Sequence, residues 1–477
     1  MFTSSSMKHP VTSPSLLCSS LLCLAACGPS TASEGEGGDE STETGETGEP
    51  GGALISGCER IEGGADGQLW SLRCGGPGRE ELRDVAIDAS GNVHVALEVD
   101  YSALEAEPIE LGNGVSFEGE GESAVLVSFD AAGEARWAQQ FAGASLEFLG
   151  ACGEGVVIVL EQAAGLDLGT GPIVDEGVLA VLDGEGELRW LRAGDYRDAW
   201  IRDAHCNATG ELALAMLLAE PLDFGGGEIG ESTNQGVVVR YAADGEFVWN
   251  RSFESEQPSA ASGVRLRDDG ELILTGDIEG SSVFGELEPP LLPDAIIARY
   301  DAAGELLWAT QFGPSVSEQF GAAVALGPEG EFSVGGSFVT DIEIDGVWYP
   351  NTVDTEEPEF MTHDAFVVTM SAEGEVGRVQ LHGGGGNERV AALGYDESGR
   401  LVTAYGGALD FAIYDGDAQV WSWSWSSGLD GVPVHMAVSD TGEMAYASVV
   451  DEVEIDLGGG ALAPHGREDL ILTRLTP

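Results

Sequence analysis

A short signature recurs along most of this chain and constrains its fold more than any other feature. Each copy reads as the end of an apolar strand, a turn of the type Asp-x-x-Gly-Glu, and a following strand that carries Trp. Asp in such a turn accepts hydrogen bonds from the backbone that follows it, and Gly supplies the positive φ that a tight hairpin needs. Clear copies lie at 129–137, 182–190, 241–249 and 300–308, and degenerate copies at 370–378 and 414–421.

A second hairpin alternates with the first and shows the period-2 alternation of half-buried strands. Two hairpins in succession predict a unit of four antiparallel strands, which we call a, b, c and d in chain order. Such four-stranded units, repeated around an axis, are typical of β-propellers. Copies of the second hairpin lie at 85–97, 264–276, 324–336, 393–405 and 437–448.

The spacing and the two ends of the repeat region predict how many units there are and how they close. Successive Trp residues from Trp70 to Trp308 lie 53 to 67 residues apart, and with the degenerate copies there are seven signatures. Residues 68–73 read as a d strand without a preceding c strand, and residues 469–475 read as a c strand without a following d strand. We therefore expect an all-β, seven-bladed propeller that is closed by pairing of these two strands. An open β-solenoid would not need such complementary halves.

Composition supports many short strands and excludes one class of partner. The chain has 70 Gly among 477 residues, which disfavours long helices, while 43% of it is hydrophobic and sufficient for a large core. Acidic residues outnumber Lys and Arg by 83 to 20, for a formal charge of −63. Such a surface repels nucleic acid and attracts cations or basic partners. It also keeps an exposed protein soluble in a salty medium.

The N-terminal region predicts export and lipid attachment. Lys8 precedes an apolar segment that is too short to span a bilayer and ends in Leu24-Ala25-Ala26-Cys27. This ending resembles the lipobox of bacterial lipoproteins, which implies cleavage before Cys27 and acylation of that cysteine; the alternative is an ordinary secretory signal. Gly28, where Asp is absent, implies the outer membrane or cell surface of a Gram-negative bacterium. We expect a signal peptide at 1–26, a flexible acidic linker at 27–60 and a propeller at 61–477.

Four cysteines remain after signal removal and lipidation, and an even number outside the cytoplasm indicates disulfides. Three pairings are open. We favour Cys58 with Cys74, at the entrance to the domain, and Cys152 with Cys206, between neighbouring repeats.

Three segments, at 84–97, 294–313 and 364–375, resemble the bacterial β-propeller repeat (SBBP-like) family of cell-surface lipoproteins. The resemblance covers roughly residues 67–477, implies the fold, and supplies no catalytic residues, since members are surface and secreted proteins of mostly undefined activity. The turn signatures are also similar to those of quinoprotein-like propellers, which include dehydrogenases and an outer-membrane assembly lipoprotein. There the match departs by one residue, because Gly stands three positions after Asp and not four.

The predicted connections differ in length between the two faces of the disc. The a–b and c–d links are tight turns, whereas the b–c and d–a links are long and lie together on the opposite face. Binding sites are usually found on variable loops of a rigid scaffold, so we expect a protein or glycan partner on the long-loop face. Its d–a loops carry the acidic residues Glu80, Glu81, Glu147, Asp195, Asp198, Glu256, Glu318, Glu388 and Asp430.

A carboxylate ring of this kind could hold Ca²⁺, with Glu318, Glu388 and Asp430 as the weak candidate ligands, although no segment has EF-hand spacing. The sequence contains no HExxH, GxSxG or Walker-type motif, and its histidines are scattered. His435, on an expected inner strand, is either a channel residue or an ordinary strand histidine. We therefore expect no cofactor and a non-enzymatic binding or scaffold protein; the alternatives are a quinoprotein-like protein and a Ca²⁺-dependent hydrolase or lyase.

Overall fold

The structure is a computed structural model in which the described residues after Gly51 belong to one compact unit. They are residues 57–63, 67–75, 79–100, 108–117, 121–230, 234–253, 255, 257–280, 284, 287, 289–313, 317–352, 362–384, 386–407, 410–424, 434–451, 455–456, 461–464 and 468–476. These residues form strands and turns throughout, and the all-β prediction is confirmed. In this part of the chain no helix is long and apolar enough to cross a bilayer.

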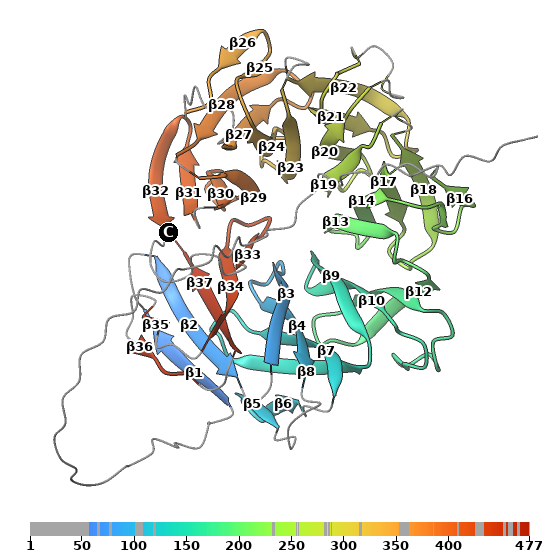
Figure 1. Ribbon diagram of the computed structural model, residues 1–477, viewed down its shortest axis with the longest axis vertical. Coiled ribbons are helices and arrows are strands. Elements are labelled where there is room, and N and C mark those ends of the chain that lie inside the picture. Colours follow the sequence, from blue (N-terminus) through green and yellow to red (C-terminus); the bar gives the residue numbers. More distant parts are fainter. Residues whose placement is uncertain are drawn as a thin grey trace, which may run out of the picture. The chain divides into compact units, whose positions relative to one another are not determined.

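Five four-stranded antiparallel sheets follow one another along the chain, each in the order a, b, c, d. Figure 1 shows the sheets arranged radially, with the a strands innermost, as in a β-propeller. The strands are β9 (Ser145–Cys152), β10 (Gly155–Glu161), β11 (Gly177–Leu182) and β12 (Leu188–Gly194); β13 (Ala199–Cys206), β14 (Leu212–Leu218), β17 (Gln235–Tyr241) and β18 (Phe247–Ser252); β19 (Ala260–Leu266), β20 (Leu272–Ile278), β21 (Asp294–Tyr300) and β22 (Leu306–Phe312); β23 (Gln319–Leu326), β24 (Phe332–Phe338), β27 (Asp364–Met370) and β28 (Val376–His382); and β29 (Arg389–Tyr395), β30 (Leu401–Gly406), β31 (Asp410–Asp415) and β32 (Ala418–Ser424).

A nine-stranded sheet contains both ends of the described chain. It consists of two antiparallel sets that are joined by one parallel residue pair, Arg79 with Glu468. One set is β3 (Arg79–Ile87), β4 (Val93–Asp100), β7 (Glu122–Phe129) and β8 (Ala135–Ala142). The other is β33 (Val434–Val438), β34 (Met444–Asp451), β37 (Glu468–Leu475), β2 (Gln68–Gly75) and β1 (Gly57–Glu62).

In that second set, β37 pairs with β34 on one side and with β2 on the other, and Leu72 lies opposite Leu472. β1 was not predicted. It pairs with β2 along its whole length, and a disulfide joins Cys58 to Cys74 across the pair. The linker predicted to reach residue 60 therefore ends earlier, because β1 begins at Gly57.

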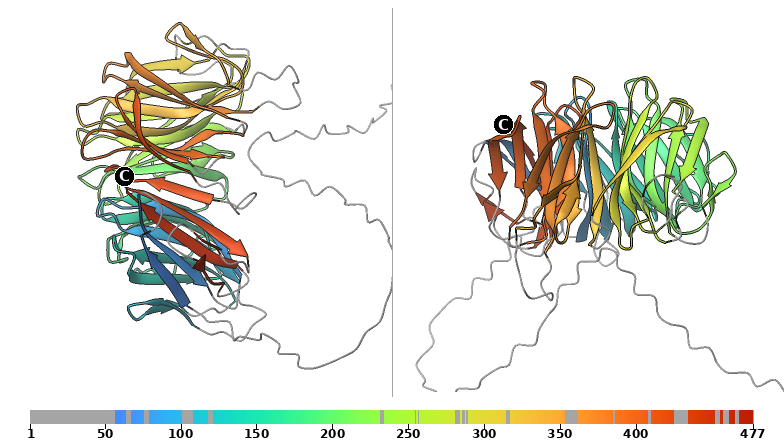
Figure 2. Two further views of the ribbon diagram at one scale, coloured as in Figure 1. Left: turned by 90° about the vertical axis from the view of Figure 1, so that its left-hand side faces the viewer. Right: turned by 90° about the horizontal axis from the view of Figure 1, so that it is seen from above.

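The long b–c connections contain four small hairpins, where the sequence predicted irregular loops. They are β5 (Ile109–Gly112) with β6 (Val115–Phe117), β15 (Leu222–Asp223) with β16 (Glu228–Ile229), β25 (Ile342–Ile344) with β26 (Val347–Tyr349), and β35 (Ile455–Asp456) with β36 (Ala461–Leu462). In the side views of Figure 2 the strands run between two faces of this unit, and successive turns alternate between them.

The recurring turn holds neighbouring sheets together. Asp130 Oδ1 accepts the backbone N–H groups of Ala132 and Glu134 at 2.8 and 2.9 Å, and Gly133 has a φ of 81°. The Trp70 ring, from the preceding set of strands, packs on this glycine so closely that a Cβ there would lie 2.8 Å from the ring. The same close approach recurs between Trp137 and Gly186, Trp190 and Gly245, Trp249 and Gly304, and Trp308 and Gly374. The signature Trp residues thus pack between sheets.

Arginines make a second recurring contact between sheets. Arg240, near the end of a c strand, pairs with Glu211 of its own sheet at 3.0 Å and donates to the Ala302 carbonyl of the next sheet at 2.6 Å. Arg299 and Arg474 repeat this arrangement with Glu271 and Ala372, and with Glu443 and Ala131. These basic side chains are neutralised inside the scaffold, which leaves the surface strongly acidic.

Candidate functional site in the central channel

A cavity of about 760 Å³ lies where the inner strands meet. Seven inner strands of the described part of the chain contribute to it, namely β3, β9, β13, β19, β23, β29 and β33, together with most of the a–b turns that follow them. Small side chains leave the space open; Ala86, Ala151, Ala204, Ala323, Ala392 and Ala437 form much of the wall. The cavity extends from the middle of the a strands to the tight a–b turns, so it reaches the face opposite to the one on which the sequence predicted binding.

Register shifts in six of the inner strands leave one residue of each strand outside the ladder, whereas β33 has no shift. The shift in β13 between Ile201 and Asp203 leaves Arg202 outside the ladder. Corresponding shifts occur at Arg83, Glu147, Ser262, Ala322 and Ala391. Such β-bulges often occur next to functional sites, because they redirect a side chain. Arg202 is exposed and lines the cavity; it makes no ion pair among the described residues, although its charge opposes the rise that burial causes in the pKa of Asp277.

Asp203 and Arg265 form the first charged pair of the cavity wall. Arg265 Nη1 donates to Asp203 Oδ2 at 2.8 Å and to the Val264 carbonyl at 2.7 Å. Asp203 Oδ2 also accepts the Val264 N–H at 2.8 Å. Arg265 is therefore held in one orientation by contacts between β13 and β19. Burial disfavours the charged guanidinium, but Asp203 and Asp440 outweigh it and raise the pKa of Arg265.

His205 lies beside this pair and has both ring nitrogens engaged. Its Nδ1 accepts the Leu266 N–H at 3.0 Å. Nε2 must then carry the ring proton, which it donates to Asp440 Oδ2 at 3.0 Å. No nitrogen of this ring is left to take a proton from a substrate, so the histidine is arranged to orient and donate rather than to act as a general base.

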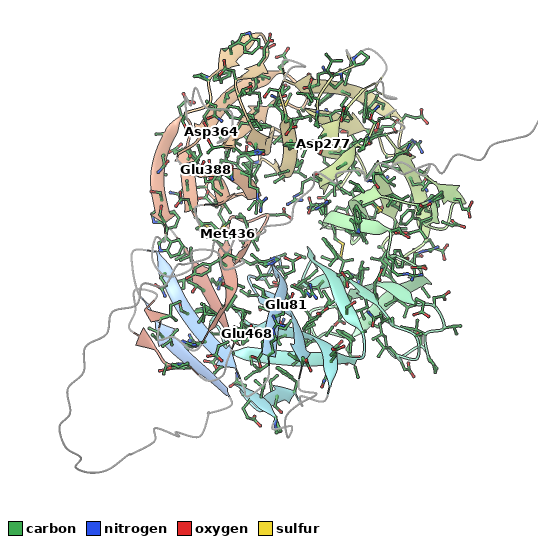
Figure 3. The ribbon with its side chains drawn as sticks, viewed as in Figure 1. Glu81, Asp277, Asp364, Glu388, Met436 and Glu468 are labelled. Atoms are coloured by element: carbon green, nitrogen blue, oxygen red, sulfur yellow. A yellow bond between two sulfur atoms is a disulfide. The ribbon has the colours of Figure 1, made fainter. Side chains whose placement is uncertain are left out.

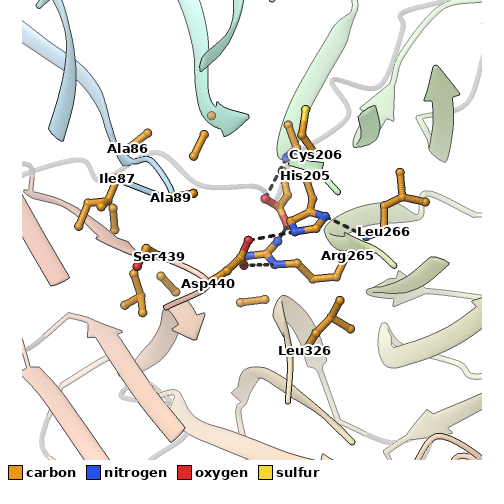
Figure 4. Close-up of a pocket in the computed structure, with 18 of the residues that line it drawn as sticks. Ala86, Ile87, Ala89, His205, Cys206, Arg265, Leu266, Leu326, Ser439 and Asp440 are labelled. Atoms are coloured by element: carbon orange, nitrogen blue, oxygen red, sulfur yellow. Dashed lines mark hydrogen bonds and ion pairs between the residues drawn. The ribbon is translucent and has the colours of Figure 1, made fainter. Parts of the chain in front are cut away.

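Asp440 completes the group, and Figure 4 shows it pointing toward His205 and Arg265. Its second oxygen, Oδ1, lies 3.4 Å from Arg265 Nε. Enclosure by the channel wall opposes ionisation, but His205 and Arg265 outweigh it and lower the pKa of Asp440 well below its usual range. The carboxylate is thus ionised at neutral pH and bridges two donors. We call His205, Arg265 and Asp440 the channel triad.

The acidic residues predicted to ring the channel mouth are not gathered at the cavity. Of those that the structure describes, none lines it, and Figure 3 shows Glu81 and Glu388 on different sides of the channel. Glu147, Asp195 and Asp198 do lie near Glu161, and burial together with these charges raises the pKa of Glu161 to about 7. Glu80 and Glu388 are buried, and Asp195 pairs with Arg197. Glu256 and Asp430 lie outside the described residues.

Within the described ranges no three His, Cys, Asp or Glu side chains are grouped as metal ligands, so Glu318 and Glu388 are not brought together as a Ca²⁺ site. A metal site needs several ligand side chains that converge on one point, and a sequence rich in Asp and Glu does not show which of them converge.

Two further predicted residues have clear positions. His435 is not a cavity residue; its Nδ1 contacts Asp84 Oδ1 of the adjacent β3 at 3.4 Å, although its neighbours Met436 and Ala437 line the channel. Cys152 and Cys206 form a disulfide that joins the ends of β9 and β13 at the cavity wall. This disulfide fixes the end of the strand that carries His205.

Comparisons with known proteins give no family. No family model matches the chain, and no curated protein matches it. Among solved structures, the WD40 domain of Neurospora crassa Pan2 is 10% identical with a TM-score of 0.43, covering 84% of this chain and 90% of that chain. Kluyvelomyces marxianus Hsv2 is 9% identical with a TM-score of 0.40, covering 80% and 97%. A gluconolactonase from Xanthomonas campestris is 12% identical with a TM-score of 0.32, covering 71% and 86%. Sequence identities and TM-scores this low do not indicate an activity for this chain.

Proposed function

We propose that this chain is a lipid-anchored, cell-surface binding protein of the SBBP-like type: a seven-bladed propeller, closed through β2 and β37, that holds a small ligand in its central channel without converting it. The observation that carries the proposal is the channel triad at the wall of the cavity. Its donors are oriented by the scaffold, while the ring nitrogens of His205 are both used. That arrangement favours recognition over acid–base chemistry.

The channel assignment is tested by filling the cavity. Ala391 is an exposed bulge residue on the cavity wall, so Ala391→Trp should displace a ligand without disturbing the ladder. Ala303, on an exposed c–d turn away from the cavity, supplies the control Ala303→Trp. Native mass spectrometry of the protein purified from its own membranes should show a bound small molecule in the wild type and in Ala303→Trp, but not in Ala391→Trp. Equal occupancy of all three would refute a channel site, and turnover of the molecule would refute a non-enzymatic role.

The proposed anchor makes an unusual chemical prediction. Lys8 is the single lysine of the chain and precedes Cys27, so cleavage before Cys27 removes it. The α-amine of Cys27 is then the only primary amine that the protein has, and triacylation blocks it. The mature protein should therefore resist an amine-reactive biotin reagent and partition into detergent. Cys27→Ser should abolish the partitioning; labelling of a mature wild-type chain would argue against N-acylation.

A second surface is proposed for a protein or glycan partner on the long-loop face. Trp348 and Val347, on the β25–β26 hairpin, are 53% and 51% exposed. Exposed aromatic side chains of this kind are enriched where partners dock. Trp348→Ala should reduce capture of surface partners in a cross-linked pull-down and leave channel occupancy unchanged, whereas Leu307→Ala, an exposed residue of an outer strand, serves as the control.

A further inference from the structure

Asp440 makes a contact that does not follow the wall of the channel. It belongs to the turn after β33, whereas His205 and Arg265 belong to β13 and β19, and it lies 235 positions from His205 in the chain. β33 packs on β3 and β29, while β13 packs on β9 and β19. The Asp440 side chain therefore crosses the open space between inner strands that are not neighbours.

The turn that carries Asp440 does not need its side chain. Ser439 Oγ accepts the N–H groups of Thr441 and Glu443 at 3.3 and 3.0 Å, which is the role that Asp88 and Asp396 have in the equivalent turns. The Asp440 side chain is 60% exposed, although protein surrounds the channel. Its polar contacts in the described structure are thus those with the two donors across the channel.

The two donors, in contrast, do not need Asp440 to keep their orientation. Arg265 is fixed by Asp203 and by the Val264 carbonyl, and His205 is fixed by the Leu266 N–H. A guanidinium and an imidazole N–H that are held in this way form a charge-assisted site for a carboxylate. Asp440 occupies that site as any carboxylate would.

We propose that His205 and Arg265 form a binding site for the carboxylate of a small ligand, and that Asp440 is an internal ligand that this molecule displaces. The inference deepens the proposed function and rests on it. Arg202 extends the site, because its guanidinium is exposed on the same wall and makes no ion pair among the described residues; the carboxyl on which its charge acts is that of Asp277, whose ionisation it favours. A ligand with a second carboxylate matches this second cation, so the class that fits is a small di- or tricarboxylate.

A tethered competitor weakens binding of a free one, because it is present at a high effective concentration. Removal of the Asp440 charge should therefore strengthen binding. Citrate, titrated calorimetrically into the full-length chain in detergent at about 0.15 M salt, should bind Asp440→Asn about ten-fold tighter than the wild type. Asp440→Ala should show at least the same gain, and Arg202→Gln in the Asp440→Asn background should lose most of it.

The matched control is Asp269→Asn, which removes the same charge from the same cavity wall without contacting His205 or Arg265. Equal gains in Asp440→Asn and Asp269→Asn would mean that only the general negative charge had been relieved, and would overturn the inference. Unchanged citrate affinity in both Asp440 variants, with melting curves that show folded protein, would overturn it as well. Either result leaves the proposed function to be decided by Ala391→Trp, whose readout is the natural ligand and not citrate.

Discussion

Arg73 Nε donates to Asp469 Oδ2 over 2.7 Å, and neither side chain has any exposed surface. The two residues lie 396 positions apart, on β2 and β37, and Arg73 also donates to the Leu462 carbonyl at 3.2 Å. An ion pair that is removed from water is costly to break on one side only, since the partner then remains as a buried, uncompensated charge. This pair therefore favours correct pairing of β2 with β37.

Asp469→Asn should lower the free energy of unfolding by about 3 kcal/mol, because it removes a buried carboxylate that pairs with the buried Arg73 guanidinium. A neighbouring pair, Arg79 with Glu468, joins β3 to the same strand β37 but is 66% and 28% exposed. Glu468→Gln should cost less than about 1 kcal/mol, since solvent screens it. Urea unfolding midpoints compare the two variants. Similar losses of unfolding free energy in the two variants would show that burial does not make the Arg73–Asp469 pair more important for stability.

Gly133→Ala tests the contact between sheets. The substitution meets two penalties, a φ of 81° and a Trp70 ring 2.8 Å from the new Cβ. Gly114 has a similar φ of 76° but nothing within 4 Å of its Cβ position. Gly114→Ala should therefore cost about 1 kcal/mol from the backbone alone, and Gly133→Ala roughly 2 kcal/mol more because the ring must move. Thermal melts of both variants would measure the difference, and equal melts would contradict the packing role of Trp70.

The two disulfides should differ in how much they stabilise the folded protein. Cys152 and Cys206 are 54 positions apart, and Cys58 and Cys74 are 16 apart. In the chain-entropy model, the longer loop stabilises by about 4 kcal/mol and the shorter by about 3 kcal/mol. Replacing each pair by two serines should reproduce this order in chemical denaturation. The reverse order would show that packing at the cysteines, and not loop closure, dominates.

Asp277 predicts a pH dependence. Burial raises the pKa of Asp277 to about 7, while Arg202 opposes that rise. The folded state then binds this proton more tightly than the unfolded state, so the contribution of Asp277 to stability is lost as the pH rises from about 4 through about 7. Asp277→Asn should melt like the wild type near pH 4 and be more stable near pH 8, by on the order of 2 kcal/mol. An equal effect at both pH values would exclude the shifted titration.

The fold could be predicted because the sequence signals that specify it are local and repeated. The Asp130 turn, the positive φ of Gly133 and the Trp137 that follows are all encoded within nine residues, and each copy corroborates the others. β1 was missed because its strand character depends on β2, which pairs with it and is disulfide-bonded to it.

The cavity was not predicted, because it depends on register. Arg202 faces the channel through a bulge that no residue pattern announces, and Asp440 meets His205 only when distant sheets are brought to one axis. The sequence directed attention to long loops rich in Glu and Asp, whereas the polar groups that meet at the cavity lie on inner strands and on an a–b turn. One signal was present in the sequence: Ser439 supplies the hydroxyl that accepts the N–H groups of the turn, so the side chain of the adjacent Asp440 is not needed for the turn.

The disulfide between Cys58 and Cys74 determines how the unit responds to a pulling force on its N-terminal strand. A tensile load that enters the unit at Gly57 reaches Cys58 at once and passes covalently to Cys74, so the ladder of hydrogen bonds between β1 and β2 is bypassed. The load then falls on β2 where it is bonded to β37, and Arg73 with Asp469 stands directly beside the point of entry. In the proposed lipid-anchored state, a pulling force would thus be resisted by the pairing of β2 with β37, and the unit would not unravel from the edge strand β1.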